Sequence, residues 1–267
     1  MNALAQRGAA LLGGTLASAS AIGGGSLSQI VRIQLTDGRE AIVKTGPAPV
    51  EEAAMLFMMA KAGVPVPAML GADGAILVLS VVENNGSLSG AWADLGRVLK
   101  TLHAAHGQGY GWWADYAFGS VAIVNTPSDD WPSFWAEHRL LANVRHVDRD
   151  IARRLHALAK DLPNRLPQHP APSLLHGDLW GGNVLVSGNS ISALIDPACY
   201  YGDGLVDVAM LQMFDSPPPA FFDAYGNEEA GDERLMIYRL WPALVHLRLF
   251  GAGYGSLVRS LLDALGV

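Results

Sequence analysis

The chain has 267 residues, of which 50% are hydrophobic and 16% charged, with a formal net charge of -7 and a pI near 5.5. A chain of this length and composition forms one large domain or two lobes around a buried core, which excludes disordered and fibrous classes. The acidic balance argues against nucleic-acid binding, which uses a basic face, and is weakly compatible with a cationic substrate.

The single cysteine, Cys199, excludes an internal disulfide and a cysteine-rich metal site. We therefore expect a reducing compartment, the cytoplasm. Cys199 either fills the core or, three residues after Asp196, senses oxidation. No run approaches the roughly 18 consecutive apolar residues of a membrane span, so no membrane partner is expected.

The N-terminal part predicts a helix followed by a strand hairpin. We expect a short helix over Asn2 to Leu12, although Ala9 to Ala21 superficially resembles a signal-peptide cleavage region. Apolar and polar residues alternate over Gln29 to Leu35, and a second strand, Glu40 to Lys44, follows a turn. The pattern is therefore strand, turn, strand, with glycines before it and a lysine at its end.

Those glycines and that lysine suit the phosphates of ATP. Backbone at Gly24, Gly25 and Ser26 lacks bulk and can approach phosphate oxygens closely, and a strand lysine such as Lys44 can reach them. Taken singly, the glycine run is equally an ordinary loop, and Lys44 an ordinary surface lysine.

The next helix, predicted over Val50 to Ala62, places Glu51 and Glu52 in its first turn. We choose Glu52 as the partner that orients Lys44, in the manner of the lysine–glutamate ion pair of protein kinases. The alternative is that both acids only suit the helix N-terminus.

An apolar strand-like run, Ala75 to Glu83, ends in a polar turn. This is where a nucleotide kinase joins its lobes, so we expect backbone near Ser80 and Val82 to hydrogen-bond adenine. The predicted domains are an ATP-binding lobe, 1–83, and a catalytic and substrate-binding lobe, 84–267.

The second lobe is predicted to be mainly helical. Ser89 to His103 has apolar residues at helical spacing, and Glu137 to Leu162 is a long charge-rich region that suggests a solvated helical face. His103 and His106 have no third ligand at a metal-like spacing, so we interpret them as solvated or hydrogen-bonded.

The strongest functional pattern lies between His176 and Pro197. Asp178 and Asn183 have the D-x-x-x-x-N spacing of a kinase catalytic loop, and Asp196 follows a predicted hairpin. In a kinase the first aspartate accepts the acceptor's hydroxyl proton, while the asparagine and the later aspartate hold Mg²⁺. Alternatively, these residues make a turn, a cap and a strand end.

Motifs along nearly the whole chain carry a family resemblance. They are GGGS at Gly23 to Ser26, AIVK ending at Lys44, EAAML from Glu52, VPVP from Val64, YGWWADYAFG at Tyr110 to Gly119, DDWPSFWAEHRL at Asp129 to Leu140, HGDLWGGN from His176, YGDGLVDVAM from Tyr201 and YRLWPALVHLRLFGAGY at Tyr238 to Tyr254. In these motifs the chain resembles the fructosamine kinases, or ketosamine-3-kinases, within the aminoglycoside phosphotransferase-like kinases. Trp180 discriminates best, because related antibiotic, choline and homoserine kinases resemble HGDLHPGN at this place.

The resemblance implies an α+β, bilobal protein-kinase-like fold: a small lobe with an antiparallel sheet and one main helix, and a larger, mainly helical lobe. It implies transfer of the ATP γ-phosphate, with Mg²⁺, to the 3-hydroxyl of a ketosamine, a glycation adduct, and hence protein repair. By resemblance Asp178 is the base, Asn183 and Asp196 hold Mg²⁺, and Lys44 with Glu52 and Gly24 to Ser26 contact ATP.

Three further residues have structural or substrate roles in this reading. His176 holds the loop backbone, and Asp207 either braces the catalytic loop or is only a helix N-terminal acid. Trp180 offers a flat face to a sugar, or packs in the core beneath the loop.

Two departures from the family pattern concern the acceptor. Val121-Ala122-Ile123 stands where relatives often have Thr-Pro-Gln, and Gly204-Leu205 where they often have Arg-Glu. Both remove polar groups that could face the acceptor. Two alternatives therefore stay open: a kinase for another hydroxylated amine, such as an aminoglycoside or amino alcohol, and a non-catalytic nucleotide-binding relative.

Overall fold

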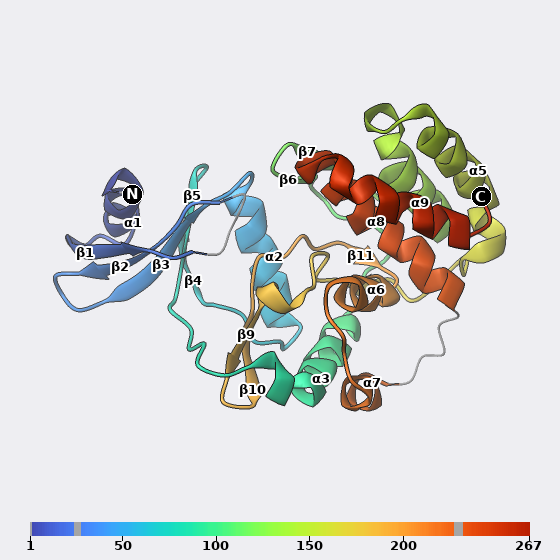
Figure 1. Cartoon of the computed structure of the whole chain (residues 1–267). Helices are drawn as coiled ribbons and strands as arrows, with labels where there is room; N and C mark the ends of the chain where they lie inside the picture. The colour runs from blue at the N-terminus through green and yellow to red at the C-terminus, as the bar shows by residue number, and fades with distance from the viewer. Residues whose placement is uncertain (1, 24–27, 227–231) are drawn as a thin grey trace.

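The N-terminal part of the chain forms a five-stranded antiparallel sheet with a helix on each face (Figure 1). The computed structural model describes residues 2–23, 28–226 and 232–267. In spatial order the strands are β1 (Leu16–Ala21), β2 (Ile30–Leu35), β3 (Glu40–Thr45), β5 (Ile76–Leu79) and β4 (Met69–Ala72). The helices are α1 (Asn2–Leu11) and α2 (Pro49–Lys61).

Alternation along the strands explains why both faces of the sheet are covered. In β2, every second side chain is buried, and Val31, Ile33 and their neighbours pack against α1. Leu77 and Leu79 of β5 instead contact Ala53 and other residues of α2. Successive residues of a strand point to opposite faces, so one sheet supports two small cores.

Most N-terminal elements expected from the sequence are confirmed, and two strands were missed. The first helix, the hairpin β2–β3 and α2 lie within two residues of the predicted ranges. β1 occupies part of the Ala9 to Ala21 segment, where its small residues gave no strand pattern, and β4 was not expected. The apolar run from Ala75 is a strand only as far as Leu79.

The segment after β5 is fastened to a second hairpin, formed by β9 (Val184–Ser187) and β10 (Ser190–Leu194). The backbone N–H of Gly86 donates to the Val186 carbonyl at 2.9 Å, and Ser192 Oγ donates to the Glu83 carbonyl at 2.6 Å. A Cβ at Gly86 would lie 2.4 Å from the carbonyl oxygen of Gly188, so only glycine allows this close approach.

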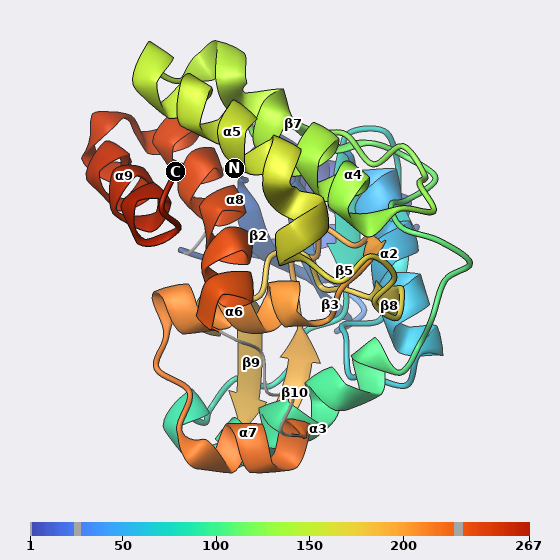
Figure 2. The ribbon, with the colours of Figure 1, turned by 90° about the vertical axis from the view of Figure 1, so that its right-hand side faces the viewer.

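The rest of the chain is mainly helical (Figure 2). Its α-helices are α3 (Trp92–His103), α4 (Trp131–Trp135), α5 (Arg149–Arg165), α6 (Leu205–Phe214), α7 (Pro219–Tyr225), α8 (Asp232–Phe250) and α9 (Gly255–Ala264). Short strands form two further pairs, β6 (Tyr116–Phe118) with β7 (Val121–Ile123) and β8 (Ser173–Leu174) with β11 (Tyr201–Gly202). Among the described residues, no helix is long and apolar enough to cross a membrane.

The prediction of one long solvated helical region over Glu137 to Leu162 is wrong. After α4 the chain makes a π-helical turn, 136–140, and a 3₁₀ segment, 141–146, before α5 begins anew with Asp148 as its N-cap. Arg139 is fully buried and stacks over the rings of Tyr200 and Trp241, at 4.2 and 5.2 Å. This buried cation, in contact with two aromatic rings, is the reverse of the solvated face expected here.

Cys199 belongs to the core, as the simpler sequence interpretation held. Its side chain is fully buried, and its backbone N–H donates to Met55 Sδ at 3.2 Å. Burial raises the pKa of the Cys199 thiol well above its ordinary value, which keeps it protonated and unreactive.

Candidate active site

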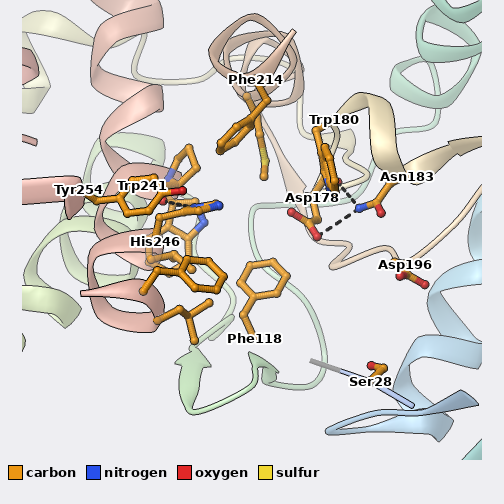
Figure 3. Close-up of a pocket in the computed structure, with 16 residues that line it drawn as sticks. Ser28, Phe118, Asp178, Trp180, Asn183, Asp196, Phe214, Trp241, His246 and Tyr254 are labelled. Carbon is orange, nitrogen blue, oxygen red and sulfur yellow. Dashed lines mark hydrogen bonds between the residues drawn. The ribbon is translucent and has the colours of Figure 1, made fainter. Parts of the chain in front are cut away.

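The segment from β8 to Asp196 brings the three kinase-loop residues together. A turn at His176-Gly177-Asp178 and a 3₁₀ turn, Gly181–Asn183, lead into the hairpin β9–β10, and Asp196 follows directly after it. Asp178, Asn183 and Asp196 line one cavity of about 450 Å³ (Figure 3). The hairpin predicted from the sequence is confirmed, and it explains how residues 13 positions apart meet.

Two unusual backbone conformations shape this segment. Gly177 has a φ of 79°, and a Cβ there would lie 2.1 Å from the Ala198 carbonyl oxygen, so the turn requires glycine. Asp196, with a φ of 55°, is the non-glycine residue with positive φ in the described part of the chain. Such a conformation is costly for most residues and is often found at functional sites.

Asp207, on the first turn of α6, braces the loop from behind. Its carboxylate accepts the backbone N–H groups of His176 at 2.7 Å and Gly177 at 2.9 Å. It is fully buried and also contacts His103 Nε2 at 3.1 Å. Burial alone would raise the pKa of Asp207, but hydrogen bonds and charge from His103, with help from His176 and Gly177, lower it. The bracing role predicted for Asp207 matches this geometry.

His176 fastens the loop to the strand that precedes Asp196. Its Nδ1 accepts the Asp178 backbone N–H at 3.3 Å, so Nε2 carries the proton and donates to the Ile195 carbonyl at 2.9 Å. Burial lowers the pKa of His176, which keeps the ring neutral. His176 therefore holds backbone, as expected, and is turned away from acid or base chemistry.

The strand lysine joins the two parts of the protein. Lys44 Nζ lies 2.9 Å from Glu52 Oε1 and 2.5 Å from Asp196 Oδ1. Lys44 and Glu52 are only 5% and 2% exposed, so the pair is shielded from water. Burial alone would lower the pKa of Lys44, but the charges of Glu52 and Asp196 raise it and keep the ammonium charged. Of the two acids in this turn, Glu52 is the one that contacts Lys44, and its role in orienting Lys44 toward ATP stays a prediction.

Asp178 is held where its carboxylate faces the cavity. Asn183 Nδ2 donates to the Asp178 carbonyl at 2.8 Å and to Oδ2 at 3.2 Å. Burial, opposed by the Asn183 hydrogen bond and reinforced by the charge of Asp196, raises the pKa of Asp178 to about 7. A carboxylate with a pKa near neutrality is suited to accept a proton from a hydroxyl group.

Donor chemistry at the loop suits a hard cation. Asn183 binds Asp178 through its nitrogen and Asp196 binds Lys44 through one oxygen, which leaves Asn183 Oδ1 and the second Asp196 oxygen for a ligand. The part of the chain that the structure describes contains no cluster of three or more His, Cys, Asp or Glu residues arranged for a metal. Two oxygen ligands fit Mg²⁺, which usually completes its shell with water and phosphate oxygens.

Trp180 stands at the wall of the same cavity. It is 41% exposed and packs over Gly182, where a Cβ would lie 2.2 Å from the indole ring. The alternative that Trp180 fills the core is therefore wrong. Further aromatic side chains continue the wall away from Asp178: Phe118, Phe214, Trp241, His246 and Tyr254 (Figure 3). Phe250 lines the same cavity.

Sequence reasoning missed several groups that support or line the site. His103 was interpreted only as solvated or hydrogen-bonded, yet it links Asp207 to the Tyr225 hydroxyl at 2.8 Å. Asp215 Oδ2 accepts the Gly181 N–H at 2.7 Å and anchors the other end of the loop. Single acids and histidines carry no spacing signal, so nothing in the sequence marked them.

Other predicted positions lie at or beyond the margin of the cavity. Gly24, Gly25 and Ser26 fall outside the described residues. Ser80 N–H is taken by the Ala68 carbonyl, at 2.8 Å, whereas its own carbonyl and the Val82 N–H have no partner in the described ranges. The departures at Val121 to Ile123 and Gly204 do not line the cavity, and Gly204 instead packs against His103.

A model of the fructosamine kinase family matches residues 4–266 of this chain. The chain belongs to the fructosamine kinase family. Among curated relatives, the chloroplastic protein-ribulosamine 3-kinase of Arabidopsis thaliana is 32% identical over 264 residues, covering 91% of this chain and 80% of the relative. A Synechocystis protein described as a ketoamine kinase is 34% identical over 209 residues, covering 74% of this chain and 71% of its own.

Solved structures agree with the fructosamine kinase assignment. A Thermobifida fusca protein described as a fructosamine-3-kinase has a TM-score of 0.88 and 28% identity, with 99% of each chain covered. The aminoglycoside phosphotransferase APH(4)-Ia shares the fold, with a TM-score of 0.69, 18% identity and 94% of each chain covered. The bilobal, kinase-like α+β fold expected from the sequence is thereby confirmed.

Proposed function

We propose that this protein is an ATP-dependent kinase that transfers the γ-phosphate of ATP to a sugar hydroxyl of a ketosamine. The observation that carries the proposal is one cavity in which Asp178, Asn183 and Asp196 face an exposed tryptophan, Trp180. Membership of the fructosamine kinase family supports the reaction, and the names of the curated relatives support the ketosamine class.

The nucleotide is proposed to bind between a first lobe, 1–83, and a second lobe, 84–267. In this arrangement Lys44, held by Glu52, contacts phosphate oxygens, and the segment from Gly24 to Ser26 covers the phosphates. The adenine base is proposed to form hydrogen bonds with the Ser80 carbonyl and the Val82 N–H, which have no partner among the described residues. Support for this comes from the antiparallel sheet, the buried ion pair and the linker fastened to the hairpin β9–β10.

In the proposed reaction the acceptor hydroxyl loses its proton to Asp178 as its oxygen attacks the γ-phosphorus, and ADP leaves with the electrons of the broken P–O bond. Asn183 and Asp196 would hold Mg²⁺, which neutralises phosphate charge when bound. Lys44 already contacts Asp196, so nucleotide binding would share Lys44 between that carboxylate and the phosphates. A cytoplasmic location, where ATP is available, suits this activity.

The assignment to ketosamines rests on Trp180 and its neighbours. Aromatic faces pack well against the carbon side of a sugar, and they attract an ammonium group. The charged side chains that line the cavity are Asp178 and Asp196, both acidic. A ketosamine offers both features, a polyhydroxy chain and an amine that is cationic at neutral pH.

The direct test is an ADP-release assay with MgATP over ketosamines of different sugar length, with aminoglycosides and amino alcohols in parallel. We expect turnover with ketosamines, a product phosphorylated at one sugar hydroxyl by phosphorus NMR, and a kcat lower by about 10²–10⁴-fold in Asp178→Ala.

Turnover with an aminoglycoside or amino alcohol alone would instead assign another hydroxylated amine. ATP binding without phosphorylation of any compound would indicate a non-catalytic relative. A wild-type rate in folded Asp178→Ala would remove Asp178 as the base.

A further inference from the structure

The cavity has an aromatic end that the proposed chemistry does not use. Trp241, His246 and Phe250 come from α8, and Phe214 comes from the end of α6. Figure 3 shows Trp241 and His246 across the cavity from Asp178 and Trp180. Phosphate transfer takes place at the opposite, carboxylate end, so these side chains face the part of the acceptor that does not react.

His246 packs among the aromatic side chains of this end. Its ring centroid lies 4.9 Å from that of Phe214, 5.4 Å from that of Phe250 and 5.0 Å from that of Tyr254. An imidazole among apolar rings is expensive to bury unless its polar atoms find partners. One of its nitrogens has such a partner within the protein.

That partner determines which nitrogen carries the proton. His246 Nδ1 lies 2.8 Å from the Pro242 carbonyl oxygen, one helical turn earlier. A carbonyl only accepts hydrogen bonds, so Nδ1 must donate, and in the neutral ring Nε2 is then an acceptor. Burial lowers the pKa of His246, which favours the neutral ring. Nε2 has no hydrogen bond to any residue that the structure describes.

We propose that His246 is an acceptor-binding residue, whose Nε2 accepts a hydrogen bond from an N–H or O–H group of the bound ketosamine while the surrounding rings pack against its carbons. This inference rests on the proposed function. A ketosamine carries both kinds of donor, its ammonium and its unreacted hydroxyls. The other side chains that line this end are aromatic or aliphatic, among them Phe214, Val245 and Leu249, so His246 selects acceptors that place a donor at this end.

The test separates the hydrogen bond from the packing with two substitutions. His246→Phe keeps a flat ring and removes the acceptor, and His246→Gln keeps an acceptor oxygen on a side chain of similar reach. The control is His156→Phe, an exposed histidine on α5 that does not line this cavity. Thermal melts establish that each variant is folded.

We expect His246→Phe to raise the KM for the ketosamine about tenfold, the scale of one lost hydrogen bond to a substrate. The KM for ATP and the kcat should change less than twofold, and His246→Gln should recover most of the loss. His156→Phe should behave as wild type. If His246 had a purely structural role, His246→Phe would change the KM for ATP, the kcat and the melting temperature together.

Substrate analogues identify the donor. With an ether-linked analogue, in which oxygen replaces the amine, the difference between wild type and His246→Phe should vanish if the ammonium is the donor. With a series of deoxy analogues, the difference in KM between wild type and His246→Phe should vanish for the analogue that lacks the donor hydroxyl, if a hydroxyl is the donor.

A folded His246→Phe with an unchanged ketosamine KM, or a KM increase that persists with every analogue, would overturn the inference. Absence of ketosamine turnover by the wild-type enzyme is a separate result, and it would overturn the proposed function itself.

Discussion

Asp207 accepts the backbone N–H of Gly177 at 2.9 Å, across 30 residues of sequence. Residue 177 must be glycine, because a Cβ there would clash with the Ala198 carbonyl oxygen. The turn therefore has no side chain of its own at this position, and the bond to Asp207 holds it instead. The same carboxylate also binds the N–H of His176, so the residue before Asp178 and its neighbour are both fixed to α6. The position of the candidate base is thus set by a buried acid outside the catalytic motif.

Asp207→Asn is therefore expected to destabilise the fold by about 3 kcal/mol at pH 7, because an amide nitrogen would face two backbone donors in a buried site. Urea unfolding at several pH values measures this. The pKa of Asp207 is below its ordinary value of 3.8, so its contribution to stability is present above that pH and is lost as the pH falls below it. The difference in the free energy of unfolding between wild type and Asp207→Asn should become smaller below about pH 4.

The control for this variant is Asp148→Asn. Asp148 also accepts two backbone N–H groups, those of Asp150 and Ile151, but at an exposed helix start. Asparagine is as good an N-cap as aspartate, so this change should cost less than about 1 kcal/mol. Equal losses in the two variants would contradict a special role for Asp207.

Glu52→Gln is expected to raise the KM for ATP about tenfold and to lower kcat, because Lys44 would lose one of its two carboxylate partners and turn toward Asp196. Glu51→Gln is the matched control, since Glu51 is the neighbouring acid of the same helix turn and forms no ion pair among the described residues. Steady-state kinetics at varied ATP distinguishes the two. Similar effects from both variants would mean that helix charge, not the Lys44 contact, matters.

Regular patterns in the sequence were enough to predict the elements that carry the reaction residues. Alternation predicts β2 and β3, and the turn Ser187-Gly188-Asn189 predicts the hairpin that leads to Asp196. The single helical region over Glu137 to Leu162 was predicted wrongly because the position of Arg139 in the core depends on Tyr200 and Trp241, which are distant in sequence. Tertiary contacts of this kind leave no local signal.

The site residues also fall into those that a local sequence pattern predicts and those that only tertiary contacts reveal. Lys44, Glu52 and Asp178 belong to motifs with characteristic spacings, so the sequence predicts them. His103 contacts Asp207 and His246 packs against Phe214, both on another element, and a single histidine has no spacing to recognise. The sequence pointed to Val121 to Ile123 and to Gly204-Leu205 as positions that could face the acceptor, but the cavity wall away from Asp178 is formed mainly by α6 and α8.

Trp180→Ala is expected to raise the KM for the acceptor about three- to tenfold, the range that corresponds to one aromatic contact. Its effect on the KM for ATP should be less than twofold, because the proposed role of the indole is to pack against the acceptor and not against the nucleotide. Trp113→Ala is the control: Trp113 is 59% exposed, stacks on Trp112 and does not line the cavity. Acceptor titrations at saturating ATP measure the difference, and a loss confined to kcat would contradict a binding role.

Asp178→Asn should remove kinase activity and stabilise the folded protein. The pKa of Asp178 is raised from 3.8 to about 7 by burial in the folded state. The unfolded chain therefore releases this proton first, and the stability of the wild type falls as the pH rises from about 4 to about 7. Asparagine accepts the same Asn183 hydrogen bond without becoming charged.

The variant should consequently melt a few degrees above wild type at pH 8, with roughly 1 kcal/mol corresponding to 2–4 °C in a chain of this size. The difference in melting temperature between Asp178→Asn and wild type should become smaller toward pH 5. Paired melts over this pH range, with ADP release in the same samples, provide the measurement. An inactive variant that melts lower than wild type at pH 8 would contradict the cost of burying the Asp178 carboxylate, and with it the raised pKa.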